Sequence, residues 1–434
     1  MSTAAPTGFV GLSHLGLVAS IGWASRGDPV IAVDSDREIV DLLTRSELPI
    51  LEPGLEDALS AARPRMAFTT DVASLGECPL VILSRDVPTT EDNISDVSLV
   101  EQLLEAATPH LRPQATVVVM SQVPPGFTRS VASRLRRSRP GAGFRVYYWV
   151  ETLILGHAMN RFLRPERIIL GCEDPRAALP DVLEQGLKRF DCPLLPMRYE
   201  SAELTKTAIN LYLCSAVTYA NTLSDICERI DADWSEVVPA LRLDARIGPA
   251  AYIRPSLGIS GGNLERDLMT LQRLGRQRGV DVSFIDTIIA YNARRSQWIM
   301  NKLDTLVFAQ VPTPTIAVWG LTYKRGTRSL KNSHALRAIS SLGPRARWRA
   351  FDPAVQPPIE DTNVTLVRSR DEALVDADCL LIMTDWEEFA SIDTAAFRRA
   401  MRRPLVIDCV GILEGRRGDL EGIRYVSMGL GDGL

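Results

Sequence analysis

Apolar positions along this chain follow one rhythm, change to another, and then return to the first. Between Phe9 and about residue 195, short apolar runs alternate with amphipathic helical segments. The runs read PVIAVD, PLVILS, ATVVVMS, RVYYWV and RIILG, and two of the helical segments read REIVDLLTRS and SLVEQLLEAATPHL. Strands that alternate with helices are typical of βαβ units and a mostly parallel sheet. The pattern therefore predicts an α/β domain in this part of the chain.

Strand signals vanish from about residue 200 to 300, where long helical patterns begin with SAELTKTAINLYLCSAVTYANTLSDICERI. The alternation returns with TPTIAVWG at residue 313 and continues through RWRAFDP, CLLIMTDW and PLVIDCV. A helix of that length between two α/β blocks is a natural spacer and dimer surface, so we expect a homodimer. We expect an α/β fold with two Rossmann-like parallel-sheet domains, residues 1–199 and 306–434, joined by a central long-helix region at residues 200–305.

Composition and charge exclude several classes of partner. A chain of 434 residues, with 24% charged and 46% hydrophobic residues, is typical of a globular protein with two or three domains. The net charge of -4, with both signs interspersed, is not that of a nucleic-acid-binding protein. No apolar run reaches the ~18 to 20 residues of a membrane span, and the N-terminus lacks a signal-peptide pattern. We therefore expect a cytoplasmic protein with no nucleic-acid or membrane partner.

The cysteines and histidines do not indicate a metal centre. The seven cysteines are scattered without CxxC spacing, which argues against both a disulfide framework and a zinc site. The four histidines never pair at ligand spacing. The cysteines are therefore expected to be reduced core residues, and no bound metal is predicted.

The turn GLSHLG, from Gly11 to Gly16, follows the first predicted strand and opens a helix. An acid, Asp34, ends the next strand about 20 residues later, as in a dinucleotide-binding βαβ unit. The glycines would allow the tight turn and close helix packing, the helix N-terminus would meet a pyrophosphate, and the acid favours NAD over NADP. Ser13 stands where a glycine is wanted, so an ordinary strand-to-helix turn is the alternative.

Further segments follow in order: SELPILEPGLEDAL, SRDVPTTED, SQVPPGFT, VETLILGHAMNRFLRPERIILG, AELTKTAINLYL, DARIGPAAYIRPSLGISGGNLERDL, VWGLTYKRGTRSLKNSHAL and MTDWEEF. In this order and spacing the chain resembles the UDP-glucose/GDP-mannose dehydrogenase family over nearly its whole length. The resemblance implies an N-terminal NAD-binding Rossmann domain, a central helical dimerisation region and a C-terminal α/β domain that holds the nucleotide sugar. It also implies NAD as the cofactor and a UDP- or GDP-linked sugar as the substrate.

The resemblance brings out one missing residue. Members of the family oxidise a sugar C6 alcohol to a carboxylate in two hydride transfers, and a cysteine in the segment GGSCFPKD captures the aldehyde between them. When the aspartate of that segment is placed on Asp267, the cysteine position falls on Asn263. A neutral amide has no usable nucleophilic lone pair, so Asn263 cannot take over the covalent step.

The rest of the family's catalytic apparatus is retained. Lys206 and Asn210 lie four residues apart, on one helix face. By resemblance they stabilise charge that develops on a substrate oxygen, and Asp267 works with the lysine and a water to remove the hydroxyl proton. Glu151 matches the acid associated with thioester hydrolysis. A solvated charge or a salt bridge is the alternative reading of each residue taken alone.

The resemblance also implies cofactor and substrate contacts. The cofactor set is Gly11, Ser13, His14, Leu15, Gly16, Asp34, Val87, Pro88, Thr89, Ser121 and Lys331. The substrate set is Tyr252, Arg254, Gly258 and Lys324. Two departures concern the substrate: the family's RES reads KNS at residues 331–333, and DGRN reads DCVG, which replaces an arginine by Val410. The sugar is therefore expected to differ from glucose or mannose, or to be handled differently.

Three functions remain open. A two-electron NAD-dependent oxidoreductase would make an aldehyde or ketone and stop, or return the hydride and so epimerise a carbon. A complete C6 dehydrogenase could oxidise the hydrated aldehyde without covalent capture. A non-catalytic protein would bind NAD or the nucleotide sugar for assembly or regulation. The retention of both Lys206 and Asp267 favours catalysis over binding.

Overall fold

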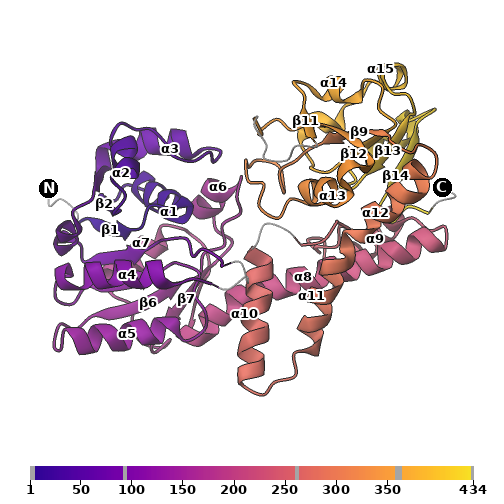
Figure 1. The fold of residues 1–434 in the computed structure, drawn as a ribbon. Helices are drawn as coiled ribbons and strands as arrows, with labels where there is room; N and C mark the ends of the chain where they lie inside the picture. Colours follow the sequence, from indigo (N-terminus) through magenta and orange to yellow (C-terminus); the bar gives the residue numbers. More distant parts are fainter. Residues whose placement is uncertain (1–4, 91–94, 260–262, 357–363, 432–434) are drawn as a thin grey trace. The chain divides into compact units, whose positions relative to one another are not determined.

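The computed structural model describes residues 5–90, 95–259, 263–356 and 364–431. The chain forms two compact units, Met1–Ile209 and Asn210–Leu434, and each is built on one sheet (Figure 1). Strands alternate with helices in both units, and within the described residues all strand pairs but one are parallel. The expected α/β fold class, with two Rossmann-like sheets and a long-helix region between them in sequence, is confirmed.

The first unit contains an eight-stranded sheet in the order β3-β2-β1-β4-β5-β6-β7-β8. Among its described strands, only β6 and β7 pair antiparallel. The strand order reverses between β1 and β4, and ligands of open α/β sheets bind at the carboxyl ends of the strands at such a point. The strands are β1 Thr7–Val10, β2 Val30–Val33, β3 Met66–Thr69, β4 Leu80–Leu83, β5 Thr116–Val119, β6 Arg145–Trp149, β7 Ile168–Cys172 and β8 Leu194–Arg198.

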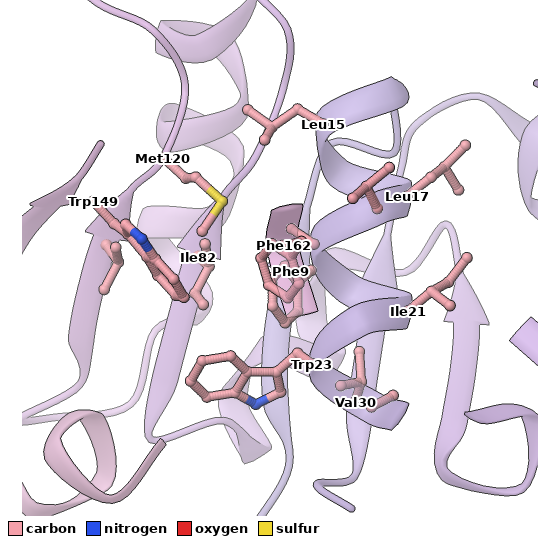
Figure 2. Close-up of a cluster of buried hydrophobic side chains, with 14 of the residues drawn as sticks. Phe9, Leu15, Leu17, Ile21, Trp23, Val30, Ile82, Met120, Trp149 and Phe162 are labelled. Atoms are coloured by element: carbon pink, nitrogen blue, oxygen red, sulfur yellow. The ribbon is translucent and has the colours of Figure 1, made fainter. Parts of the chain in front are cut away.

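Helices of the first unit cover its sheet and enclose two apolar cores. The segment that follows the glycine turn is apolar on nearly all sides, and it forms an almost wholly buried helix, as expected of such a pattern. Figure 2 shows its Trp23 close to Trp149, with the ring centroids 6.0 Å apart in an edge-to-face contact. The helices are α1 His14–Ser25, α2 Arg37–Thr44, α3 Leu55–Ala62, α4 Ser98–Ala107, α5 Phe127–Ser138, α6 Ala158–Leu163, α7 Asp181–Lys188 and the first part of α8 Tyr199–Arg229.

The second unit combines helices with a six-stranded parallel sheet in the order β11-β10-β9-β12-β13-β14. Its helices are the second part of α8, then α9 Trp234–Leu243, α10 Asn263–Gln277, α11 Ser283–Arg295, α12 Gln297–Leu303, α13 His334–Leu342, α14 Arg370–Leu374 and α15 Thr394–Ala400. Its strands are β9 Thr315–Trp319, β10 Arg347–Phe351, β11 Val364–Leu366, β12 Cys379–Ile382, β13 Leu405–Asp408 and β14 Arg424–Ser427.

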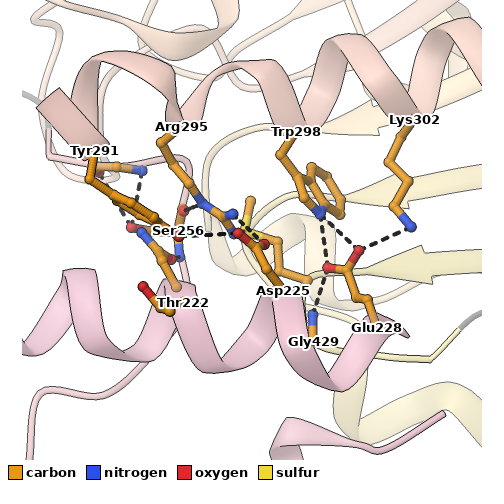
Figure 3. A network of polar contacts seen from close by, with 12 residues as sticks. Thr222, Asp225, Glu228, Ser256, Tyr291, Arg295, Trp298, Lys302 and Gly429 are labelled. Carbon is orange, nitrogen blue, oxygen red and sulfur yellow. Dashed lines mark hydrogen bonds and ion pairs between the residues drawn. The ribbon is translucent and has the colours of Figure 1, made fainter. Parts of the chain in front are cut away.

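A polar network joins α8 to α11 and α12 inside the second unit (Figure 3). The buried Arg295 guanidinium lies 2.5 Å from the Asp225 carboxylate. The Glu228 carboxylate pairs with Lys302 at 3.1 Å and accepts a hydrogen bond from the Trp298 indole at 2.8 Å. Because each buried charge has an opposite charge beside it, the network can hold these helices together without an unpaired ion.

Within the described residues, no helix combines the length and the apolar character that crossing a bilayer requires.

Candidate functional site

The turn between β1 and α1 has the geometry of a dinucleotide-binding turn. Gly11 adopts a φ of +91°, and a Cβ placed there would lie 2.8 Å from the Cβ of Arg85. A Cβ at Gly16 would lie 1.8 Å from the carbonyl oxygen of Gly11, so the helix approaches the strand too closely for any side chain. Asp34 follows β2 and is buried, and its Oδ2 accepts a hydrogen bond from the Leu12 amide at 2.5 Å. Both glycines, and the place of the acid at the end of β2, are therefore those of a dinucleotide-binding turn.

Two charged residues after β4 also lie against this turn. The Asp86 amide donates to the Ser13 hydroxyl at 2.7 Å, and the Leu15 amide donates to Asp86 Oδ2 at 3.0 Å. The Arg85 guanidinium lies 3.2 Å from Asp34 Oδ2. The sequence interpretation missed both residues. The signal was a charged pair directly after a buried strand, at the carboxyl edge where the strand order reverses.

The other expected cofactor residues are divided between the units. His14 begins α1, and its Nε2 lies 2.9 Å from a carboxylate oxygen of the buried Glu52. The same carboxylate accepts hydrogen bonds from the amides of residues 156 and 158. The loops after β4 and β5 hold the remaining residues of the first unit, of which Val87 and Ser121 are buried, Thr89 is half-buried and Pro88 is exposed. Lys331 is exposed and belongs to the second unit, between β9 and α13.

Lys206 and Glu151 form an ion pair in the first unit. The lysine Nζ lies 2.7 Å from the Glu151 Oε1 and donates a hydrogen bond to the Glu151 carbonyl at 3.0 Å. Both side chains are largely buried. The Glu151 carboxylate and carbonyl together hold the ammonium in place. Glu151 also lines a small cavity of about 20 Å³ together with Leu15 and Met120. Leu15, expected to contact the cofactor, therefore borders the same cavity as Glu151, which belongs to the expected catalytic set.

Asn210 and Asp267 are brought together in the second unit, although 57 positions separate them in the sequence. The Asn210 amide donates to Asp267 Oδ2 at 2.5 Å, and the Arg266 Nε lies 3.3 Å from Asp267 Oδ1. All three side chains are buried. Both oxygens of the Asp267 carboxylate therefore have a donor.

Asn263 is the first residue of α10 and is exposed. The glycines that precede it, at 261 and 262, lie outside the described residues. Cys214 lies within electrostatic range of this region, because the Asp267 and Glu265 carboxylates both disfavour its thiolate. It lies on α8 one turn beyond Asn210 and is fully buried. Burial, with the two carboxylates adding, raises the pKa of its thiol to about 12.

The other cysteines share this character, because all seven are free thiols and burial is the largest cause of a raised pKa at each. Burial raises the pKa of Cys78 to about 12 and that of Cys172 to about 11. A thiol is nucleophilic only as the thiolate. None of the seven therefore has the environment of an activated nucleophile.

An acid that the sequence interpretation did not single out lies two residues beyond Asn263. The Asn332 amide donates to the Glu265 Oε2 at 2.8 Å, and Asn332 holds a left-handed backbone with a φ of +55°. By resemblance, position 332 would hold a glutamate and position 265 a proline. Compared with the family sequence, the carboxylate of this contact therefore stands at position 265 instead of position 332. Burial raises the pKa of the Glu265 carboxyl.

The expected substrate residues lie in the second unit. Tyr252 is 54% exposed, and the exposed Arg254 donates a hydrogen bond to the carbonyl of Val410. Gly258 has a φ of +112°, and a Cβ there would lie 2.4 Å from the Asn292 Oδ1, so this position requires glycine. The Lys324 ammonium lies 5.8 Å from the centroid of the Tyr323 ring.

A larger cavity of about 560 Å³ lies in the second unit beside the network of Figure 3, where Asp225, Tyr291, Arg295 and Trp298 are among its lining residues. None of the residues expected for catalysis, cofactor or substrate lines it. Among the described residues, no three histidine, cysteine or acidic side chains are grouped so that they could hold a metal ion.

Comparisons with known proteins cover nearly the whole chain. Three domain models of the UDP-glucose/GDP-mannose dehydrogenase family match it: the NAD binding domain at residues 6–190, the central domain at 200–294 and the UDP binding domain at 317–415. The chain is 32% identical to the UDP-glucose 6-dehydrogenase of Pseudomonas aeruginosa, with 92% of each chain covered. It is 28% identical to the corresponding protein of Rhizobium meliloti, with 98% of this chain and 99% of that one covered.

A solved structure, a UDP-glucose dehydrogenase from Pyrobaculum islandicum, has the same fold. It superposes with a TM-score of 0.84 at 27% identity, and 97% of both chains are covered. The NAD binding domain includes the glycine turn and Asp34, and the UDP binding domain includes Lys324. The chain therefore belongs to the UDP-glucose/GDP-mannose dehydrogenase family, as an NAD-dependent oxidoreductase that acts on the CH–OH group of a nucleotide sugar.

Proposed function

We propose that this enzyme performs two-electron chemistry on a sugar carbinol. It makes an aldehyde or ketone, or returns the hydride and so epimerises the carbon, and it does not go on to a uronic acid through a thioester. One observation carries the proposal: position 263 offers an amide, and Cys214, the thiol on which Asp267 acts, is fully buried with its pKa raised to about 12.

Cys214 is poorly suited to replace the missing nucleophile. Burial raises the pKa of its thiol to about 12, so very little of it is present as the thiolate near neutral pH. The side chain is also 0% exposed, so a nucleotide sugar could reach it only after α8 or its neighbours moved. An aldehyde formed at this site would therefore meet water, or the returning hydride, before it met a sulfur nucleophile.

Lys206 is proposed to stabilise negative charge on the reacting oxygen. The Glu151 carboxylate and carbonyl hold its ammonium, which reduces the number of positions that the long side chain samples. In this account Glu151 positions the lysine, since there is no thioester whose hydrolysis it would assist. NAD, when bound, accepts the hydride.

Asp267 is proposed to take the hydroxyl proton, through a water as the family resemblance implies. Asn210 and Arg266 each donate to one of its oxygens, so the carboxylate is held in a fixed orientation. Asn263, at the start of α10, is proposed to be a polar residue of the site with no covalent role.

For the cofactor we propose the contacts implied by the family. The helix amides near Ser13, His14 and Leu15 would meet the pyrophosphate, and Asp34 the adenosine ribose. Gly11 and Gly16 allow the tight turn that presents these amides, because a Cβ at either position would collide with Arg85 or with the Gly11 carbonyl. The remaining proposed contacts are Val87, Pro88, Thr89, Ser121 and Lys331.

The substrate is proposed to be a UDP- or GDP-linked sugar bound by Tyr252, Arg254, Gly258 and Lys324. The hydrogen bond from Arg254 to the Val410 carbonyl supports this assignment. It brings a guanidinium to the segment in which the family has its own arginine and this chain has Val410. A cation for the diphosphate is therefore still available there.

We also propose a division into domains at residues 1–199, 200–305 and 306–434, and a homodimer built on α8. Three apolar side chains of α8 are exposed in the second unit, together with Ile230, the first residue after the helix. They lie at spacings of seven, seven and four residues: Tyr212, Tyr219, Ile226 and Ile230, with exposed fractions of 64%, 45%, 46% and 66%. Spacings of this kind place side chains along one stripe of a helix. A second copy of the same helix is the proposed partner of the stripe.

The reaction can be tested by the mass of the product. The purified protein is incubated with NAD and each of a panel of UDP- and GDP-sugars, and the products are analysed by mass spectrometry. The proposal predicts a sugar about 2 Da lighter than the substrate, because oxidation of the carbinol removes a hydride and a proton, or an isomer of unchanged mass, because return of the hydride and a proton restores both. A product about 14 Da heavier, the mass of a uronic acid formed from a primary alcohol, would overturn it.

A further inference from the structure

The amino end of α1 is the place where a dinucleotide-binding turn receives the pyrophosphate, because the first helix amides point outwards and the helix dipole favours an anion. In this chain an internal anion is already there. Asp86 Oδ2 accepts the hydrogen bond of the Leu15 amide at 3.0 Å. Leu15 is the second residue of α1, so its amide is one of those that a pyrophosphate oxygen would use.

The residue that departs from the glycine pattern takes part in this contact. Ser13 precedes α1, and its hydroxyl makes no cap hydrogen bond to the helix. It instead accepts the Asp86 amide at 2.7 Å. Asp86 is thus joined twice to the turn: its backbone amide donates to the Ser13 hydroxyl, and its carboxylate accepts from the Leu15 amide.

Arg85, the residue before Asp86, occupies part of Asp34, the acid expected to bind the ribose. A carboxylate offers about four lone-pair sites. Three donors already engage Asp34, namely the Leu12 amide at 2.5 Å, the Asp36 amide at 3.0 Å and the Arg85 guanidinium at 3.2 Å. Little capacity is left for the two ribose hydroxyls, and the ion pair holds the segment that carries Asp86 against the turn.

We propose that the Arg85–Asp86 segment masks the NAD site, so that the Asp86 carboxylate competes with the cofactor's pyrophosphate for the amino end of α1. NAD binds only when Asp86 leaves that position. The apparent affinity is therefore lower than the intrinsic affinity by the fraction of molecules in which the helix end is open. Asp86 is exposed, so its side chain can swing into solvent without disturbing a core. The effect concerns binding and is the same whichever reaction follows.

Calorimetric titration of the full chain with NAD tests the proposal, using Asp86→Ala. Removing a like charge and freeing one helix amide should lower the dissociation constant at least about tenfold. A residue that served only to cap α1 would act differently, because its loss would weaken the helix without helping an anion to bind. Thermal unfolding supplies that second readout: Asp86→Ala is expected to lower the Tm by a few degrees while it tightens NAD binding.

Asp393→Ala is the matched control. Asp393 is an exposed aspartate that caps α15 in the second unit, where its carboxylate accepts hydrogen bonds from two amides at 2.9 and 3.0 Å. This variant should lose stability with no change in NAD affinity. ADP and adenosine identify the group responsible, since only ADP carries the pyrophosphate: Asp86→Ala should tighten ADP and leave adenosine unchanged. Unchanged or weaker NAD binding by Asp86→Ala, or an equal gain for adenosine, would overturn the proposal.

Discussion

The Lys206 ammonium lies 2.7 Å from the Glu151 carboxylate, and the lysine is 11% exposed. A cation fixed in this way costs little reorganisation when negative charge develops on a substrate oxygen. We expect Lys206→Ala to lower the rate of hydride transfer by ~10² to 10³, with the nucleotide sugar still bound. Stopped-flow measurement of NADH absorbance at saturating substrate checks this.

Lys188→Ala is the control for Lys206. Lys188 also pairs with a glutamate, Glu184, but on the exposed surface of α7, where its side chain is 70% exposed. Its removal should leave the rate unchanged. A Lys206→Ala enzyme with normal turnover would show that the ammonium has no part in the chemistry.

Restoring the thiol at the family position should change the product. We expect Asn263→Cys to add some uronic acid, provided that the reacting carbon is a primary alcohol, because a thiol at the exposed first residue of α10 could capture the aldehyde. Asn263→Ser, which lacks sulfur, is the control and should give the unmodified product. Mass spectrometry of the sugar distinguishes them, and equal uronic acid from both variants would contradict a role for capture at this position.

Cys214 should be dispensable for the reaction. The proposal treats it as a core side chain, so Cys214→Ala should leave the product and its rate unchanged while it lowers the free energy of unfolding by about 1 kcal/mol. Product analysis and urea unfolding of the same variant supply both readouts. Loss of activity in a variant that remains folded would instead make Cys214 the missing nucleophile.

The burial of His334 predicts that the free energy of unfolding depends on pH. Burial lowers its pKa from the ordinary 6.5 to about 4, and the nearby Arg337 adds to the effect. Between these values the unfolded chain binds a proton that the folded chain does not, so stability falls as the pH drops from 6.5 towards 4. This amounts to about 2 kcal/mol between pH 7 and pH 5.

Urea unfolding at the two pH values measures this loss. In His334→Asn the part of the loss that is due to the histidine should disappear, whereas His110→Asn, at an exposed histidine, should behave as the unmodified protein does. An identical pH dependence in all three proteins would contradict the assignment to His334.

The dimer prediction rests on the apolar stripe of α8. We expect Ile226→Asp to shift the protein towards a monomer of 47.8 kDa in light scattering at micromolar concentration, because a charge would be buried at the centre of the proposed interface. Leu243→Asp is the control, since Leu243 is 86% exposed on α9 and lies outside the stripe. A monomeric unmodified protein would rule out this interface.

Apart from β10, whose burial alternates along the strand, the strands that the sequence pattern identified are buried on both faces. PLVILS became β4 and TPTIAVWG became β9, and in each the apolar run reflects helices on both sides of the sheet. The strands it missed include β3 and β11, which lie at sheet edges and read MAFT and VTL. Edge strands bury fewer side chains, so they carry a weaker apolar signal.

The candidate site was predictable only in part, for a similar physical reason. The glycine turn and Asp34 follow from local backbone requirements and can be recognised from the sequence. The contact of Asp86 with Leu15 depends on β1 and β4 being neighbours in the sheet, although 71 residues separate the two partners. The burial of Cys214 likewise depends on packing around α8, which no local pattern reports.

The number of NADH molecules formed per sugar consumed tests the central claim most directly. The unmodified protein is incubated with limiting nucleotide sugar and excess NAD, NADH is followed by its absorbance, and the consumed sugar is quantified by chromatography. The two-electron account predicts no more than one NADH per sugar, with no uronic acid, because none of the seven thiols is placed or ionised to carry the aldehyde into a second oxidation. Two NADH per sugar, together with a uronic acid product, would contradict it.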